Sequence, residues 1–358
     1  MKNWKFWAGM GISVIFLAVA FHGVDFSELK KAISHVSLLW LVLGIVAYYL
    51  NLVIRAWRWG YIYRHVKKVG LWTMTGATIV GYFANNVLPF RFGEVARAIY
   101  IGEREGTDKS ASLATIVVER LFDSLAALVI LALTFSIYPF PSHLSGEWEG
   151  YFRDVGIGLV TVSVLGFGVM LFMVAKRDLT TKVAEKMVKP FPQKVQNKFR
   201  KAAFSFIDGL KILTNPIEVL ALLIMSALVW LSNLLPVYLS GLAFEVPGLK
   251  FNLSETMLVL VSGMVAAAIP ASPGFVGTFH FANKMVVMLV LSVKWAEGGI
   301  SATGIKQADF GDWALSYSVI VHALYILTTT VTGALILAFS GISLAKLNRN
   351  EKTNDSLS

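Results

Sequence analysis

Residues 85–97 read NNVLPFRFGEVAR, and this stretch decides how the chain is built. It closes the apolar segment 71–88, and Pro89 ends a helix there because proline lacks an amide hydrogen and clashes with the preceding turn. Two arginines and a glutamate follow at once. An ionised side chain at the centre of a membrane helix costs about 2.5–3.5 kcal/mol on insertion scales, so these groups must pair or face water. The stretch therefore predicts a helix that breaks inside an apolar medium.

Composition places the rest of the chain in a membrane. Of its 358 residues, 56% are hydrophobic and 15% are charged, whereas a water-soluble domain carries about a quarter charged residues. A helix needs roughly 20 apolar residues to cross a ~30 Å hydrocarbon core. The apolar segments lie near residues 4–22, 37–62, 71–88, 111–137, 152–175, 217–244, 253–270, 274–293 and 313–341. The sequence predicts an all-α integral membrane protein, a polytopic bundle with about six full-span helices.

Positive charge sets the expected topology. The net charge of +10 does not indicate nucleic-acid binding, because Lys and Arg lie between apolar spans and form no single basic face. Suppose that segment 71–88 crossed the membrane fully and the charged residues after it did not cross back. The linker 176–216, with ten Lys and Arg, would then face outside, against the positive-inside rule. A re-entrant hairpin over about 71–104 removes the conflict. We expect a multi-pass protein of the cell inner membrane with both termini in the cytoplasm.

The expected domain plan is a single transmembrane domain over 1–345 and a disordered cytoplasmic tail over 346–358. The first apolar segment is expected to stay as an uncleaved helix, although Ala18-Val19-Ala20 resembles a signal-peptidase site. The linker 176–216 has an amphipathic pattern, which predicts a helix on the cytoplasmic surface.

A second broken segment covers residues 253–293. Counting membrane crossings along the expected topology, it enters the membrane from the opposite face. Its Ile269-Pro270-x-x-x-Gly274 repeats the order of Leu88-Pro89-x-x-x-Gly93. Paired broken segments of opposite orientation are typical of inverted-repeat transporters, whose helix breaks form the substrate site. Non-helical backbone at membrane depth must line a wet cavity or be buried in protein, so the two tips are expected to meet in a cavity.

Charged and amide side chains near the first hairpin are the candidate headgroup-binding residues. Arg91, Glu94 and Arg97 recur every three residues, and the glutamate and aspartate of the apolar segment 111–137 stand one turn apart. With Arg120 included, three positive side chains (Arg91, Arg97 and Arg120) and three negative ones (Glu94, Glu119 and Asp123) cancel. Arg55 and Arg58 of segment 37–62 are then left as uncompensated cations suited to a phosphate. The alternative is an ion-paired scaffold with two arginines snorkelling to the interface. The full set is Arg55, Arg58, Asn85, Asn86, Arg91, Glu94, Arg97, Glu119, Arg120 and Asp123.

The residues of the hairpin tips have a mainly architectural interpretation. Asn85 and Asn86 are suited to capping a broken helix end as well as to binding a headgroup. His280 and His322 are candidates for proton coupling, although a buried histidine satisfied by one hydrogen bond is the commoner situation. No metal-binding spacing is present, and no metal or cofactor is expected. Residues that permit tight turns or close approach are Pro89, Gly93, Pro270, Pro273, Gly274 and Gly277.

These motifs together resemble the flippase-like membrane domain of lysylphosphatidylglycerol synthases. The resemblance rests on Asn86-Val87-Leu88-Pro89-Phe90-Arg91-Phe92-Gly93-Glu94-x-x-Arg97, Glu119-Arg120-Leu121-x-Asp123, Pro273-Gly274-x-x-Gly277 and Arg55-x-x-Arg58-Trp59, and it covers nearly the whole chain. It implies re-entrant helices and a lipid-translocating role. One departure is that Phe275 and His280 stand where family members often have glycine and glutamate. Without the soluble aminoacyl-transfer domain of the synthases, the chain is not expected to make lysyl-lipid.

The sequence therefore favours a transporter over an enzyme. The expected cargo is a membrane lipid with an anionic headgroup, either a phospholipid or a polyprenyl-phosphate-linked lipid. An enzyme acting on a lipid-linked phosphate is the alternative, but no nucleophile is identifiable. A non-transporting scaffold for a lipid-modifying enzyme is a third hypothesis. A homo-oligomer and a lipid-synthesis enzyme partner are both compatible with the sequence.

Overall fold

The computed structural model describes residues 36–88, 92–138, 210–268, 273–300 and 306–342, together with parts of 161–209. Every extended regular element in these residues is a helix, and they contain no β-strand, so the predicted all-α class is confirmed. The principal helices are α3 (Leu38–Tyr63), α4 (Leu71–Val87), α5 (Gly93–Glu105), α6 (Lys109–Ile137), α8 (Arg177–Val188), α10 (Pro216–Leu242), α11 (Leu253–Ala268), α12 (Thr278–Ala296) and α13 (Phe310–Ser340).

Several expectations lie outside the described residues. These are the first apolar segment, the Ala18-Val19-Ala20 site, most of segment 152–175, the tail 346–358, and Pro89, Arg91 and Pro270 at the hairpin tips.

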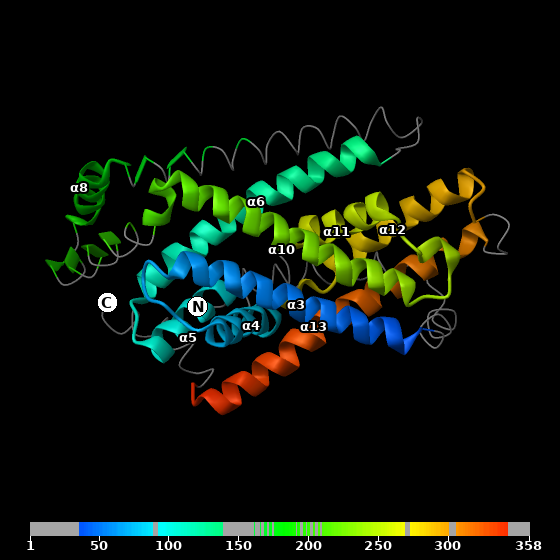
Figure 1. The fold of residues 1–358 in the computed structure, drawn as a ribbon, viewed down its shortest axis with the longest axis horizontal. Helices are drawn as coiled ribbons and strands as arrows, with labels where there is room; N and C mark the ends of the chain where they lie inside the picture. Colours follow the sequence, from blue (N-terminus) through cyan, green and yellow to red (C-terminus); the bar gives the residue numbers. More distant parts are fainter. Residues whose placement is uncertain are drawn as a thin grey trace.

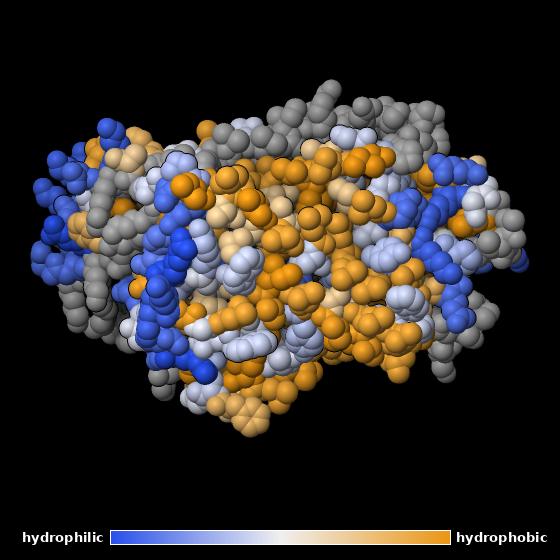
Figure 2. Space-filling model, viewed as in Figure 1, coloured by the Kyte–Doolittle hydropathy of each residue, from blue (hydrophilic) through white to orange (hydrophobic). Residues whose placement is uncertain are grey.

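Four helical stretches in the described part are long and apolar enough to cross a membrane: α3, α10, Pro273–Ala296 and Gln307–Ser340. At 1.5 Å per residue, the 29-residue α6 is about 44 Å long, which also exceeds a ~30 Å hydrocarbon core. Large apolar side chains stay exposed along the outer faces of α3, α10 and α13. Figure 2 shows this apolar surface as a broad zone between two hydrophilic ends. A zone of this kind marks contact with lipid, and the protein is a polytopic membrane protein.

The first hairpin is formed by α4 and α5, which run antiparallel. Gly81 packs against Gly93 and Arg97, and nearer the base Gly76 approaches Tyr100. The helices approach this closely because Gly93 has no side chain. A Cβ on Gly93 would clash with the carbonyl oxygen of Gly81, so only glycine fits there. The two helices therefore enter the bundle and return to the end from which they came.

The second hairpin is formed by α11 and α12. Near its tip Asn283 Nδ2 donates to Ser262 Oγ at 3.1 Å, and near its base Lys294 Nζ lies 2.8 Å from the Glu255 carboxylate. Its base adjoins the C-terminal end of α10, where Gly241 packs against Phe251.

The two hairpins open at opposite ends of the bundle. The end of α3 at Tyr63 contacts Thr107, just beyond α5, through a 2.6 Å hydrogen bond between hydroxyl groups. The other end of α3 lies beside the base of the second hairpin, because Ser37 N–H donates to the Ala243 carbonyl oxygen at 2.8 Å. The hairpins thus point toward each other from the two ends of the molecule.

The order of elements repeats once, in inverted form. A long helix, a hairpin and a long helix occur as α3, α4–α5 and α6, and again as α10, α11–α12 and α13 (Figure 1). The leading helices α3 and α10 lie side by side and antiparallel, because Arg64 pairs with Glu218 at one end while Asn51 bonds the Val229 carbonyl oxygen nearer the other. The two halves therefore have opposite directions, as in inverted-repeat transporters.

Local sequence explains where two of these helices begin. The Asp108 carboxylate accepts from the amides of Ser110 and Ala111 at the start of α6. Asn215 caps α10 by accepting from Ile217 N–H, and Pro216 takes the first helical position, where its missing amide hydrogen costs nothing.

Candidate functional site

The tips of the two hairpins meet beside the middle of α13. From the first tip, Asn86 Nδ2 donates to the hydroxyls of Thr329 at 2.9 Å and Thr330 at 3.1 Å. From the second tip, the Gly274 carbonyl oxygen accepts from His322 Nε2 at 2.7 Å. A Cβ on Gly274 would lie 3.7 Å from the Asn86 carbonyl oxygen, so the tips are in contact.

A cavity of about 490 Å³ lies at this meeting point and is open to the outside of the protein. It is lined from both tips and from α3, α6, α10, α11 and α13. Of the candidate residues, it brings together Arg55, Asn85, Asn86, Glu94, Arg120, Asp123, Gly274 and His322. Side chains that we did not predict also line it, among them Tyr48, Tyr82, Trp230, Asn233, Phe279 and Tyr325. No local sequence pattern marks these six, because they come from five different helices.

One wall of the cavity is backed by a buried network of ion pairs centred on α6. The Glu119 carboxylate contacts three guanidinium groups, at 3.2 Å from Arg58, 2.6 Å from Arg97 and 3.3 Å from Arg120. The Glu119 side chain is 1% exposed, so these arginines replace its water. Its partners come from α3, α5 and α6, and the carboxylate therefore ties three helices together.

Asp123, one turn further along α6, completes the network. Its carboxylate lies 2.8 Å from Arg58, 3.4 Å from Arg120 and 3.5 Å from Arg55. The two acidic residues lie on the same face of α6 because they are four residues apart. Arg58 contacts both carboxylates, so it holds the centre of the network.

Two of the arginines lie over aromatic rings. The guanidinium carbon of Arg97 lies 3.6 Å from the centre of the Trp59 ring, and that of Arg55 lies 5.3 Å from the Trp230 ring. Arginine above an aromatic face is attracted to the ring, most strongly where water is excluded. The Trp59 indole N–H in turn donates to Thr115 Oγ1 at 3.0 Å.

The network carries more positive than negative charge. Four arginines face two carboxylates. Glu94 lines the same cavity, and within the described part of the chain it makes no ion pair. The side chain of Arg120 is 42% exposed, whereas that of Arg58 is fully buried. Arg120 is therefore the arginine of the network that is most exposed at the cavity.

The expected charge pairing was wrong in its partners. Arg55 and Arg58 are not uncompensated cations, because both pair with Asp123 and Arg58 also pairs with Glu119. The alternative is wrong in one part, because neither side chain is more than 8% exposed and so neither snorkels to the interface, but the ion-paired scaffold that it expected is present between α3, α5 and α6. Spacing along a helix revealed only local pairs, and the stronger partners of these arginines come from another helix.

The two asparagines of the first tip have different roles. Asn85 Oδ1 accepts from the amide of Gly93 at 2.8 Å, so it caps the start of α5 across the break. Asn86 fastens the end of α4 to α13 through the two threonines. Both side chains face the cavity as well.

The second tip is held by a chain of imidazole contacts. Gly277 N–H donates to His280 Nδ1 at 3.4 Å, and His280 Nε2 lies 3.2 Å from His322 Nδ1. Since a carbonyl oxygen only accepts, His322 Nε2 must carry the hydrogen that bonds Gly274. Gly274 (φ +69°) and Gly277 (φ +95°) adopt left-handed backbone that glycine tolerates. The histidines thus fix the shape of a glycine-rich turn.

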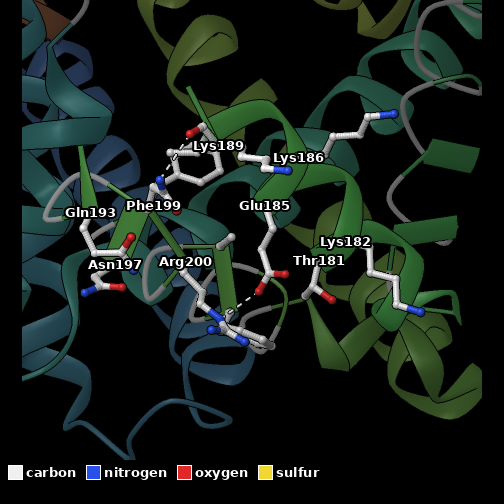
Figure 3. Close-up of a pocket in the computed structure, with 13 residues that line it drawn as sticks. Thr181, Lys182, Glu185, Lys186, Lys189, Gln193, Asn197, Phe199 and Arg200 are labelled. Atoms are coloured by element: carbon white, nitrogen blue, oxygen red, sulfur yellow. Dashed lines mark hydrogen bonds and ion pairs between the residues drawn. The ribbon is translucent and has the colours of Figure 1, made fainter. Parts of the chain in front are cut away.

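A second pocket of about 490 Å³ lies in the linker around α8, at the same end of the molecule as α5 (Figure 1). Figure 3 shows Glu185 and Arg200 facing each other there, at a carboxylate to guanidinium distance of 2.8 Å, while Lys182 points away from that pair. Their side chains are 43% and 61% exposed. An ion pair this exposed contributes little, so the cavity at the hairpin tips, with its buried charges, is the stronger candidate site.

Comparison with known proteins agrees with this architecture. The model of the family described as the lysylphosphatidylglycerol synthase transmembrane region matches residues 6–333. The chain belongs to this family. A UPF0104 membrane protein of Methanothermobacter thermautotrophicus is 23% identical over 277 residues, which cover 74% of this chain and 80% of that protein. No solved structure matches. The resemblance inferred from the motifs is confirmed, and the family connects this membrane protein with lipids.

Proposed function

We propose that this protein is a flippase of the cell inner membrane, with both termini in the cytoplasm, that moves a lipid with an anionic, phosphate-containing headgroup between leaflets. The observation that carries the proposal is the exposed guanidinium of Arg120, at the wall of a cavity where two oppositely directed hairpins meet. In inverted-repeat transporters, a site between broken helices is exposed to each side in turn.

The chemistry of the wall supports a phosphate ligand. Guanidinium groups bind phosphate through paired hydrogen bonds of fixed geometry. Arg55 and Arg120 both line the cavity, and the exposed guanidinium of Arg120 is accessible to a ligand there. The apolar outer surface of α3, α10 and α13 leaves acyl chains in contact with the bilayer while the headgroup moves.

Translocation in vesicles tests the proposal. Purified protein is reconstituted with a lipid that carries a fluorescent acyl tail and a phosphodiester headgroup, and membrane-impermeant dithionite reports which molecules have reached the outer leaflet. Arg120→Gln should lower the initial rate at least about tenfold, because a hydrogen bond to a charged group contributes about 1.5–3 kcal/mol and 1.4 kcal/mol is a factor of ten.

Arg64→Gln is the matched control. Arg64 pairs with Glu218 at 2.8 Å on the surface, outside the cavity, and its side chain is 37% exposed. The control should move lipid at the wild-type rate. A folded Arg120→Gln variant that also does so would overturn the headgroup assignment. Mass spectrometry of the same vesicles addresses the enzymatic alternative, which requires a chemically altered lipid.

A further inference from the structure

The two buried histidines of the second tip form a hydrogen-bonded chain in which each ring nitrogen has one role. His322 Nε2 carries the hydrogen that bonds the Gly274 carbonyl oxygen, so in the neutral ring His322 Nδ1 is an acceptor. His280 Nε2, 3.2 Å away, must then be the donor to it. His280 Nδ1 is left as the acceptor for Gly277 N–H. Both imidazoles are therefore neutral in this arrangement.

An additional proton has no place in this chain. A protonated imidazole donates from both of its nitrogens. On His280, a new hydrogen at Nδ1 would face the Gly277 N–H. On His322, a new hydrogen at Nδ1 would face His280 Nε2–H, and a change of tautomer in His280 would only turn its Nδ1–H toward Gly277. Wherever the proton binds, one donor faces another, so a contact of the chain must break.

The chain fastens the second tip to α13 at the point where the two hairpins meet. It spans the turn that contains Gly274 and Gly277, and Gly274 lies against Asn86 of the first tip. Breaking a contact of the chain therefore loosens the turn at that point. Because the proton binds the loosened arrangement better than the intact one, proton binding shifts the population toward the loosened arrangement.

The cavity gives a proton access to this chain, because His322 lines it, with Phe279 stacked on the ring at 4.5 Å. On α12, Lys284 follows His280 by one turn, but its side chain lies against Gly311 at the start of α13. Histidine is the side chain that ordinarily changes charge between pH 5 and 8. The other titratable groups that line the cavity in the described ranges are Tyr48 and Arg55 of α3, Tyr82 of α4, Glu94 of α5, Arg120 and Asp123 of α6, and Tyr325 of α13.

A proton at this place would also supply a charge that the second half lacks. Within the described ranges, the second half brings no Asp, Glu, Lys or Arg to the cavity wall. An anionic headgroup that leaves Arg55 and Arg120 therefore meets a positive charge in the second half only where an imidazole is protonated.

We infer that the His280–His322 pair is a proton-binding site that couples proton uptake to the release of the second tip and to the movement of the headgroup. One proton taken from the cavity converts two neutral imidazoles into one imidazolium and one neutral ring. The coupling to the headgroup rests on the proposed function, whereas the release of the tip does not.

Spin labels measure the release of the tip. The chain contains no cysteine, so Val276→Cys at the second tip and Val331→Cys on the exposed face of α13 are labelled alone. In wild-type background, the distribution of distances between the two labels in vesicles should gain a second population as the pH falls from 8 to 5, the range in which histidine ordinarily titrates.

Two histidine variants identify the group that binds the proton. His280→Gln combined with His322→Gln removes both titrating rings and keeps amide donors, so its label distances should not depend on pH. His65→Gln is the matched control, because the His65 ring pairs with Glu218 at 2.7 Å, outside the cavity, and it should keep the wild-type pH dependence.

The translocation assay measures the coupling to the headgroup. Vesicles are incubated at each pH and returned to pH 8 before dithionite is added. The wild-type rate should rise at least about threefold as the pH falls over this range, since one bound proton changes an equilibrium by up to about tenfold per pH unit. The rate of the double variant should not change with pH.

The outcomes separate this inference from the proposed function. Label distances that do not change with pH in the wild type would overturn the inference, and so would a change that persists in the double variant. A tip that responds to pH while the rate does not would overturn the coupling to the headgroup. Absence of lipid movement at every pH would overturn the proposed function and the coupling, while the label distances would still decide the proton site. If the double variant does not fold, each single variant should alter the pH dependence of the distances, and an unaltered dependence in both would overturn the site.

Discussion

Neutralising Glu119 should destabilise the protein far more than neutralising a surface glutamate. Glu119→Gln keeps the shape of the side chain but leaves Arg58, Arg97 and Arg120 without their shared carboxylate. Removing one partner of a buried ion pair costs about 3–5 kcal/mol, because the remaining charge stays buried and uncompensated. Glu218→Gln is the control, since its partners Arg64 and His65 are 37% and 28% exposed, and surface pairs contribute about 0–1 kcal/mol.

The assay is equilibrium unfolding in mixed micelles, with the free energy of unfolding measured for both variants and for Glu119→Gln combined with Arg97→Gln. The double variant removes one positive charge along with the negative one, so its loss should be smaller than the sum of the two single losses. If Glu119→Gln cost no more than Glu218→Gln, or if the double variant were fully additive, the reasoning from a buried charge network would be refuted.

Two further predictions concern the hairpin tips. Gly93→Ala should lower the free energy of unfolding by about 1–3 kcal/mol, the usual cost of overpacking, because the new Cβ would meet the Gly81 carbonyl oxygen. Gly70→Ala is the control, since its Cβ would meet no atom within 4 Å. Equal stability of the two variants would contradict the packing. His322→Leu should release the second tip, because it removes the donor to the Gly274 carbonyl oxygen, and His322→Gln, which keeps an N–H donor, should release it less. The rate of protease cleavage near the tip measures this release. Identical cleavage of both variants would show that the contact does not hold the turn.

The sequence predicted the plan of the fold because its signals are local. A proline directly after an apolar run, followed by ionised residues, marks a broken helix whatever surrounds it. The positive-inside rule then selects among the topologies, because it depends only on which loops carry Lys and Arg. The antiparallel pairing of α4 with α5, and of α11 with α12, needs no information from the rest of the chain.

The site was harder to predict because its contacts are long-range. Arg58 and Glu119 are 61 residues apart in sequence, and no periodicity joins them. The i,i+3 contact between Arg120 and Asp123 could be read from spacing, yet Asp123 lies closer to Arg58 than to Arg120. Gly333 shows the same limit: a Cβ there would lie 2.4 Å from Phe83, so α4 and α13 touch at a position that no sequence motif marked.

The two halves share their order of elements but differ in charge, and this difference yields a last prediction. Every Asp, Glu, Lys or Arg that lines the cavity in the described ranges comes from α3, α5 or α6, and the second half contributes uncharged groups such as Asn233 and Thr329. A headgroup that moves toward the second half must therefore leave the arginines of the first half. Stronger attraction at the first half should slow the release of the headgroup from that wall.

Asp123→Asn raises the positive charge of that wall by one without removing an arginine. Folded Asp123→Asn protein, isolated by size-exclusion chromatography, should retain more anionic lipid per molecule in mass spectrometry and yet translocate it more slowly than the wild type. Arg120→Gln should lower both quantities, because it removes the most exposed cation of the network. Equal losses of retention and rate in Asp123→Asn would mean that the carboxylate itself binds the cargo, and the assignment of the arginine wall would then have to be abandoned.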